Sequence, residues 1–329
     1  MTDPEPAPKP PGSFSGLGEI TSGIVAGLVS ALAAVAATSG LPLVTAFSIF
    51  ASLPILLVGL VNGPRAAIIA SAVAALGVGA VSAFVIGLAT FALAFGPAAY
   101  MSYLLNLARP ADELGGPSDG MAWYPLADTI FRTCLAVALG TVVVGLLFNY
   151  ESDAVRAALA QLIDEMVAVS ANPEQLGTEA ERAVAVNTVV AVLPAAQPFG
   201  SVLSLLANMY LAIKIGRARG LVKRPPDDMR LALRLPSLGL LVFGIALAFS
   251  FSDGTLGLVA RVFAGALAAG FMVAGFAIVH FALRASAVKT PVLFGLYVAT
   301  AIAVFPAFLM MALGLFSTAR AVPISKQKD

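Results

Sequence analysis

From Thr21 to Ala108 the chain carries a single charged residue, Arg65. Soluble domains have about 25% charged residues on average, whereas a membrane-spanning helix needs roughly 20 predominantly apolar residues. This stretch alone is long enough for about four crossings. The whole chain of 329 residues is 59% apolar and 11% charged. We therefore predict an all-α fold, a polytopic transmembrane helical bundle, and exclude soluble enzymes and secreted disulfide scaffolds.

Turn-forming residues divide the apolar sequence into nine predicted spans. Gly40 and Pro42 separate the first two, and Gly63 with Pro64 separates the second from the third. The expected spans are 20–38, 41–61, two within 66–108 that divide near 82–84, 125–148, 184–213, 237–252, 257–283 and 291–316. Eight spans are the alternative, if one late segment does not cross.

The charged segments between the spans set the predicted orientation. The loop 214–234 carries seven basic residues and two acids, whereas the segment 151–182 carries seven acids and two arginines. Because Lys and Arg concentrate in cytoplasmic loops, we place the basic loop 214–236 and the N-terminus inside and the acidic segment outside. Residues 153–170 have the spacing of an amphipathic helix, which we expect to lie on the membrane surface.

The two terminal segments differ in how they fit this orientation. Residues 1–19 are rich in proline and lack the basic start of a signal peptide, so we expect a disordered cytoplasmic tail. The tail 317–329 carries Arg320, Lys326 and Lys328. Nine spans would place these basic residues outside, against the rule that orients the rest of the chain.

Several short stretches, spread over most of the chain, carry a family resemblance. They are Ser30-Ala31 through Ser39-Gly40-Leu41-Pro42-Leu43, Trp123-Tyr124-Pro125-Leu126, Asn208-Met209-Tyr210-Leu211-Ala212 with Gly220-Leu221-Val222-Lys223-Arg224-Pro225, and Gly275-Phe276-Ala277-Ile278-Val279-His280. With them the chain resembles the YybS-like family of bacterial multispanning inner-membrane proteins, which is distantly similar to the S-components of energy-coupling factor transporters. The resemblance implies a six-span S-component-like module over 20–213, a three-span unit over 237–316, and capture of a vitamin or metal from outside.

Small residues recur at every fourth position in two of the predicted spans. They are Gly23, Gly27 and Ala31 in the first span, and Ala67, Ser71, Ala75 and Gly79 in the third. Such faces let helix backbones approach closely, which favours helix association in lipid. They either pack against helices of this same chain or dock a transmembrane partner subunit, as the resemblance to S-components implies.

Asp128 and Arg132 lie one helical turn apart near the start of the span 125–148. Charged side chains inside a membrane cost about 2.5–3.5 kcal/mol even on insertion scales, and the spacing lets them pair. They are either a self-compensating pair at the membrane boundary or a coupling or ligand group within the bundle.

The span 184–213 concentrates polar and helix-breaking residues. Its polar members are Asn187, Gln197, Asn208 and Tyr210, and its prolines are Pro194 and Pro198. A proline frees a backbone carbonyl, which at membrane depth must face protein or a water-filled cavity. This span is therefore our candidate for a cavity-lining interrupted helix, with a purely structural kink as the alternative.

Arg261 and His280 are the remaining polar residues of interest, and we expect structural roles for both. Arg261 can pair with Asp253, and the lone histidine has no accompanying ligand cluster for a metal. The chain lacks GxxxxGK[ST], HExxH, GxSxG and CxxC motifs. We therefore expect no enzyme activity, no cofactor and no metal centre.

The leading functional hypothesis is an integral inner-membrane protein that binds or transports a small molecule of the vitamin or metal class. The alternative is a non-transporting membrane scaffold that docks a partner through its small-residue faces. A net charge of +1 gives no basic footprint for nucleic acid. The expected partners are membrane lipids, attracted by the basic loop, and a transmembrane subunit.

Overall fold

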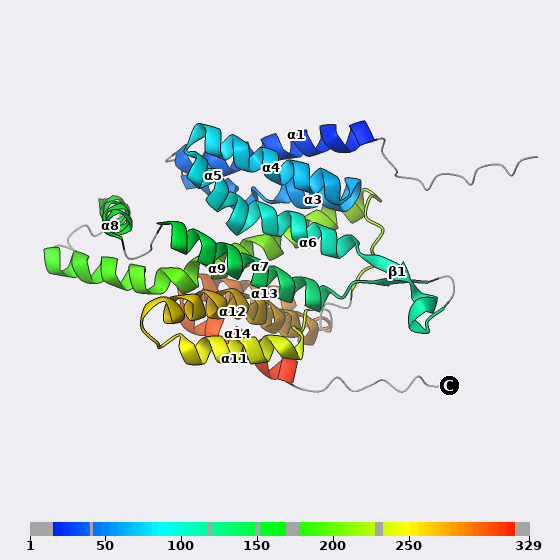
Figure 1. The fold of residues 1–329 in the computed structure, drawn as a ribbon. Helices are drawn as coiled ribbons and strands as arrows, with labels where there is room; N and C mark the ends of the chain where they lie inside the picture. Colours follow the sequence, from blue (N-terminus) through cyan, green and yellow to red (C-terminus); the bar gives the residue numbers. More distant parts are fainter. Residues whose placement is uncertain are drawn as a thin grey trace, which may run out of the picture. The chain divides into compact units, whose positions relative to one another are not determined.

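The computed structural model describes residues 16–39, 42–117, 120–148, 152–168, 178–227 and 233–319, and these are largely helical (Figure 1). Seven helices in the described part are long and apolar enough to cross a membrane, and eight if one bent pair counts as a span. The prediction of an all-α polytopic bundle is confirmed. The chain forms two compact units: 1–124 with 204–225, and 125–203 with 226–329. This division differs from the expected modules 20–213 and 237–316.

Unit 1 contains the first four spans and the C-terminal part of a long helix. Its elements are α1 Gly16–Val35, η1 Ala36–Ser39, α2 Pro42–Phe47, η2 Ser48–Phe50, α3 Leu53–Asn62, α4 Pro64–Val81, α5 Phe84–Thr90, the π-helical turn η3 Phe91–Phe95 and α6 Gly96–Asn106. Gly63 has a φ of 97° between α3 and α4, a conformation open to glycine, so the tight turn forms where it was predicted. Ile55, Phe95 and Met101 are fully buried in this unit.

A small β-ribbon follows α6. β1 Ala108–Pro110 pairs antiparallel with β2 Met121–Trp123, and η4 Ala111–Leu114 lies between them. The polar segment 109–120 therefore contains regular secondary structure. The side chain of Arg224, only 4% exposed, donates from Nη1 to the carbonyl of Tyr124 at 2.8 Å. This bond ties the chain after β2 to the basic loop of the same unit.

Unit 2 is built around α12 Gly254–Ala282. In the most apolar stretch of this helix, 67% of the residues are buried. Its other elements are α7 Leu126–Phe148, α8 Asp153–Ala168, residues 179–203 of α9 Glu179–Ala218, α11 Ser237–Phe249, α13 Lys289–Ile302 and α14 Val304–Ala319. The amphipathic helix predicted over 153–170 is therefore present as α8. Phe271 of α12 packs edge-on against Phe243 of α11, with ring centroids 5.4 Å apart.

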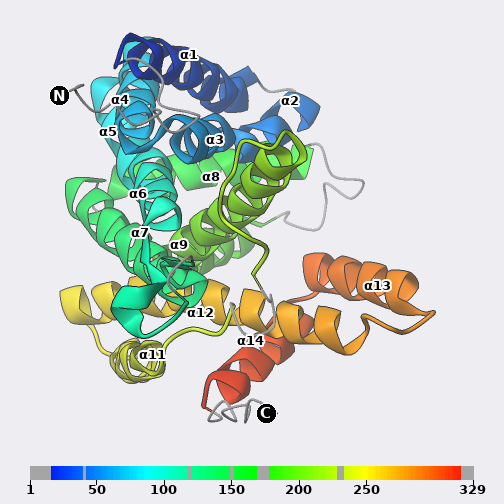
Figure 2. The same cartoon turned by 90° about the vertical axis from the view of Figure 1, so that its right-hand side faces the viewer.

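Two of the late predicted spans differ from their expected form. α11 has only 13 residues, or about 20 Å of helix, which is shorter than a hydrocarbon core of about 30 Å. The span expected over 291–316 is broken at Ala303, and α13 and α14 meet at 116° (Figure 2). Pro306 explains the break, because its ring would clash with the carbonyl of Ile302 in a continuous helix. Within the described residues the count is therefore seven or eight, below the nine predicted and within the alternative of eight.

The predicted interruption of the span 184–213 is absent. α9 is one helix of 40 residues that continues through Pro194 and Pro198. Gly265 of α12 lies directly against the backbone carbonyl of Ala195, so the proline-containing segment is supported by close contact with a neighbouring helix. At about 1.5 Å per residue α9 is about 60 Å long, twice the thickness of a hydrocarbon core.

Candidate functional site

A polar cavity of about 220 Å³ lies within unit 2, where α8, α9 and α12 meet. Its lining residues are Arg156 from α8, Asn187, Val190, Ala191 and Pro194 from α9, and Leu258 and Arg261 from α12. The successive positions 187, 190, 191 and 194 lie on one face of α9, because they are three or four residues apart. This face closes one side of the cavity.

Both arginines of the cavity are half-buried and held by a hydrogen bond. Arg156 donates from Nη1 to Oδ1 of Asn187 at 2.5 Å. Arg261 donates from Nε to the carbonyl of Gly257, one turn earlier in α12, at 3.1 Å. The first bond holds the Arg156 guanidinium against α9, and the second holds the Arg261 guanidinium against its own helix, α12.

Hydrogen-bond donors dominate the polar groups of this cavity. A guanidinium has five N–H donors and no acceptor, and the Asn187 amide has two donors besides the oxygen that already accepts from Arg156. No Asp or Glu is among the lining residues, and neither arginine forms an ion pair within the described ranges. A donor-rich site with two positive charges has the chemistry to bind an anion.

The predicted pairing of Arg261 with Asp253 is wrong. Asp253 is exposed at the start of α12, and the two residues are eight positions apart, or about 12 Å along the helix. Arg261 therefore bonds to the nearer carbonyl of Gly257. Arg261 forms no ion pair with a carboxylate of the described residues.

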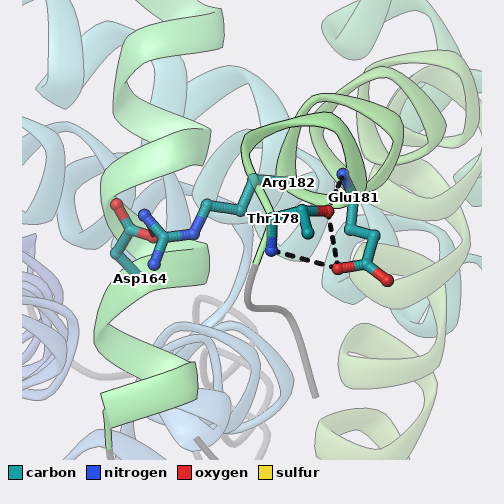
Figure 3. A network of polar contacts seen from close by, with 4 residues as sticks. All are labelled: Asp164, Thr178, Glu181 and Arg182. Atoms are coloured by element: carbon teal, nitrogen blue, oxygen red, sulfur yellow. Dashed lines mark hydrogen bonds and ion pairs between the residues drawn. The ribbon is translucent and has the colours of Figure 1, made fainter. Parts of the chain in front are cut away.

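α8 is attached to α9 by a second contact, shown in Figure 3. Arg182 of α9 forms an ion pair with Asp164 of α8 at 3.4 Å, with the two side chains 50% and 52% exposed. Together with the Arg156–Asn187 bond, it holds α8 across the N-terminal part of α9, which runs across the page in Figure 1 while α8 is seen end-on.

A capping box fixes the start of α9 in the same region (Figure 3). The hydroxyl and the backbone N–H of Thr178 donate to Oε2 of Glu181 at 2.7 and 3.1 Å, and the N–H of Glu181 donates back to the Thr178 hydroxyl at 3.3 Å. This reciprocal arrangement satisfies backbone donors that a helix start leaves unpaired. The N-terminal end of the cavity-lining helix is therefore well defined.

Pro194 contributes to the cavity through the backbone. It has no N–H, so the carbonyl of Val190 lacks its helical donor, and both residues line the cavity. A freed carbonyl of the prolines was expected to face protein or a cavity. Gln197 is half-buried one turn further along α9, and neither it nor Pro198 is among the lining residues.

The other predicted ligand residues lie elsewhere. Asp128 is half-buried and Arg132 exposed in the first turns of α7. Tyr210 is 51% exposed, and Lys214 lies over its ring at 5.8 Å from the centroid. Among the six candidates only Asn187 lines the cavity, so the structure does not bring the predicted set together.

Asn208 has a structural contact in unit 1. Its buried Nδ2 donates to the carbonyl of Ile49 at 2.7 Å and to the carbonyl of Ser204 at 2.8 Å, and the Ser204 hydroxyl also donates to Ile49 at 2.9 Å. Ile49 lies in η2, where the second span changes from η2 to α3. Asn208 thus satisfies a carbonyl at an irregular point of the backbone.

The predicted small-residue faces contact helices of the same unit. Gly23 and Gly27 of α1 lie against the carbonyls of Ala66 and Ala70 of α4, and Ala31 lies against Gly77. In α4, Ser71 is buried, Ala67 lies near Gly59 of α3, and Ala75 and Gly79 lie near Gly87 of α5. These contacts are made within the chain and use the close approach that small residues allow.

The comparisons with known proteins give a family. Residues 28–317 match the family described as "Predicted membrane protein (DUF2232)". The chain belongs to this family. No curated protein and no solved structure matches the chain. The membrane class predicted from composition therefore holds, and the description of the DUF2232 family specifies no activity.

Arg156 is the cavity residue that sequence reasoning missed, and Arg261 was given only a structural role. Arg156 is a basic residue in an acidic amphipathic segment, and Arg261 is a charge within an apolar span. Each is unusual for its context, and an ionisable residue within a span is by default a functional candidate. The sequence alone offered no sign that the two come together.

Proposed function

We propose that this membrane protein captures a small anionic molecule, bearing a carboxylate or phosphate group, in the cavity formed by α8, α9 and α12. The observation that carries the proposal is the pair of half-buried arginines, Arg156 and Arg261, in a cavity whose described lining includes no carboxylate. Arginine binds carboxylates and phosphates with two parallel hydrogen bonds. Of the vitamin and metal classes expected from the sequence, this lining favours an anionic organic ligand over a metal cation.

The size of the cavity limits the ligand. A volume of about 220 Å³ corresponds to about seven water molecules at about 30 Å³ each. Pockets for drug-sized ligands occupy about 300–1,000 Å³. The cavity therefore suits a small carboxylate or phosphate, or the charged end of a larger molecule.

The proposed setting is the bacterial inner membrane with the N-terminus in the cytoplasm. The charge difference between the acidic segment 151–182 and the basic loop 214–236 supports this orientation. The cavity then lies on the outer side, beside α8, where it can take a solute from outside. This placement agrees with the S-component-like capture that the resemblance implies. The scaffold alternative is less well supported, because its small-residue faces contact helices of unit 1.

Ligand binding can be tested on the full chain purified in nanodiscs. Thermal-shift screening and calorimetry would use phosphate, short carboxylates and organic phosphates. Arg156→Gln and Arg261→Gln should each weaken binding by tenfold or more, because a hydrogen bond to a charged group contributes about 1.5–3 kcal/mol. Arg284→Gln is the matched control, since Arg284 stacks on the Phe281 ring at 3.7 Å, outside the cavity lining.

Two results would contradict the proposal. One is the absence of stabilisation by every anion in the screen, and the other is unchanged affinity in both cavity variants. Co-purification of a stoichiometric membrane partner, together with the absence of ligand binding, would support the scaffold alternative.

A further inference from the structure

An apolar groove of about 760 Å³ runs between α1 and α3 in unit 1. It extends from Leu17 to Ala26 along α1 and from Pro54 to Asn62 along α3, which is about 14 Å of each helix. The two polar side chains of α1 in the groove use their hydroxyls internally: Thr21 donates to the carbonyl of Leu17 at 2.9 Å and Ser22 to that of Glu19 at 3.1 Å. The groove therefore presents an apolar wall.

At one end of the groove, basic residues lie close in the sequence to the residues that line it. Leu17, Asn62 and Leu221 line this end, because the start of α1, the end of α3 and the loop after α9 lie together there (Figure 1). Gly216 of α9 lies near both Val222 of the loop and Leu57 of α3, so the loop and α3 meet beside this glycine. The side chains of Arg65, Arg219 and Lys223 are exposed within three residues of these lining positions.

The charge at this end is positive and unpaired. Arg65, Arg219 and Lys223 form no ion pair in the part of the chain that the structure describes. Glu19, beside Gly18 in the first turn of α1, is the adjacent acid, which leaves an excess of positive charge. The side chain of Asn62 is half-buried at the same end and makes no hydrogen bond to a described residue, so its amide is available to an ester or hydroxyl group.

We propose that the groove is a binding site for an anionic phospholipid, with an acyl chain between α1 and α3 and the phosphate head group beside Arg65, Arg219 and Lys223. An apolar channel that ends at an amide and then at basic side chains matches the order of groups in a phospholipid: acyl chain, glycerol esters and phosphate. The volume lies within the range of pockets that hold a ligand of about drug size. This site is separate from the arginine cavity of unit 2.

Native mass spectrometry of the delipidated full chain tests the site. Phosphatidylglycerol should bind in preference to phosphatidylcholine of the same acyl chains. We expect phosphatidylglycerol binding to be about fivefold weaker in each of three variants, Arg65→Gln, Arg219→Gln and Lys223→Gln. Each basic residue near an anionic lipid surface strengthens binding by about that factor. A dihexanoyl phosphatidylglycerol arm separates head-group binding from acyl-chain binding, and it should bind much more weakly than the long-chain lipid.

Ala26→Phe tests the acyl-chain part, because a ring at this half-buried lining position fills the groove. It should abolish selective retention of phosphatidylglycerol, whereas Ile24→Phe on the exposed side of α1, outside the lining, should not. Equal binding of the two lipids would overturn the proposal. Unchanged phosphatidylglycerol binding in Ala26→Phe, measured on protein with a normal melting temperature, would also overturn the proposal. That result is expected if a helix of another protein occupies the groove.

Discussion

At the scale of single residues, two glycines make a close contact between α12 and α14 in unit 2. A side chain at Gly275 of α12 would overlap the backbone carbonyl of Met310, and one at Gly314 of α14 would overlap that of Phe271. Helix association in lipid depends on such close packing, because burying apolar surface there gives little gain. The two glycines therefore act together at one crossing.

Gly275→Ala should destabilise the protein by about 1–3 kcal/mol, the typical cost of overpacking a close contact. Thermal unfolding in detergent would measure the loss. Gly244→Ala in α11 is the control, because that position has open space and alanine is the better helix former. An equal loss in both variants would show that the crossing is not the cause.

The sequence predicted which residue types make close contacts, but only some of their partners. Gly23 and Gly27 were found through their regular spacing, and they do lie at a helix contact. Gly275 and Gly314 belong to no such stripe, and their importance depends on where α12 and α14 cross. Asn208 was predicted as a ligand residue, whereas it hydrogen-bonds to Ile49, 159 residues away, a distance that no local pattern encodes.

At the scale of elements, the start of α9 is the best-defined helix end in the described chain around the cavity. Thr178→Ala would remove the hydroxyl that accepts from the Glu181 N–H and donates to its carboxylate. Loss of such a cap costs about 0.5–2 kcal/mol of helix stability. Hydrogen exchange should become faster in the first turn, at residues 179–182.

Thr188→Ala provides the matched control for this prediction. The Thr188 hydroxyl donates to the carbonyl of Val184 within the helix and is exposed, so its removal should leave exchange at 179–182 unchanged. Wild-type exchange in Thr178→Ala would mean that the capping box does not hold the helix end.

The sequence predicted most helices because charged residues and turn formers bound them. The prediction of spans was wrong where a single proline or a short helix determines the structure. Pro306 lies inside an apolar run, so hydropathy alone predicts one continuous helix there. The helix is instead broken at Ala303. Conversely, Pro194 and Pro198 were expected to interrupt a helix that stays continuous, because contact with a glycine of a neighbouring helix, Gly265, accompanies them.

At the scale of the whole molecule, the proposed orientation gives opposite accessibility to α8 and to the loop after α9. In a Cys134→Ser background, which removes the buried native thiol, Ala157→Cys should react with a membrane-impermeant maleimide on intact cells. Lys223→Cys should react only after permeabilisation. Both positions are exposed, so burial does not determine the result, and the reverse pattern would invert the orientation.

The candidate cavity was less predictable than the fold. The proline-containing helix was predicted to line a cavity, and Pro194 does line one. The charged residues of that cavity, however, come from α8 and α12. Arg156 and Arg261 are 105 positions apart in the sequence, and neither belongs to a recognisable motif. Only the packing of three helices brings them to one cavity, so composition and spacing could not have paired them.

The glycine crossing of α12 and α14 also limits how unit 2 can open. Sliding either helix by one turn would bring a side chain against a carbonyl, so the crossing has a single register. The attachment of α8, in contrast, includes a half-exposed ion pair, a kind of contact that contributes about 0–1 kcal/mol. We therefore expect movement of α8, which would carry Arg156 with it, to cost less than movement of α12, which holds Arg261.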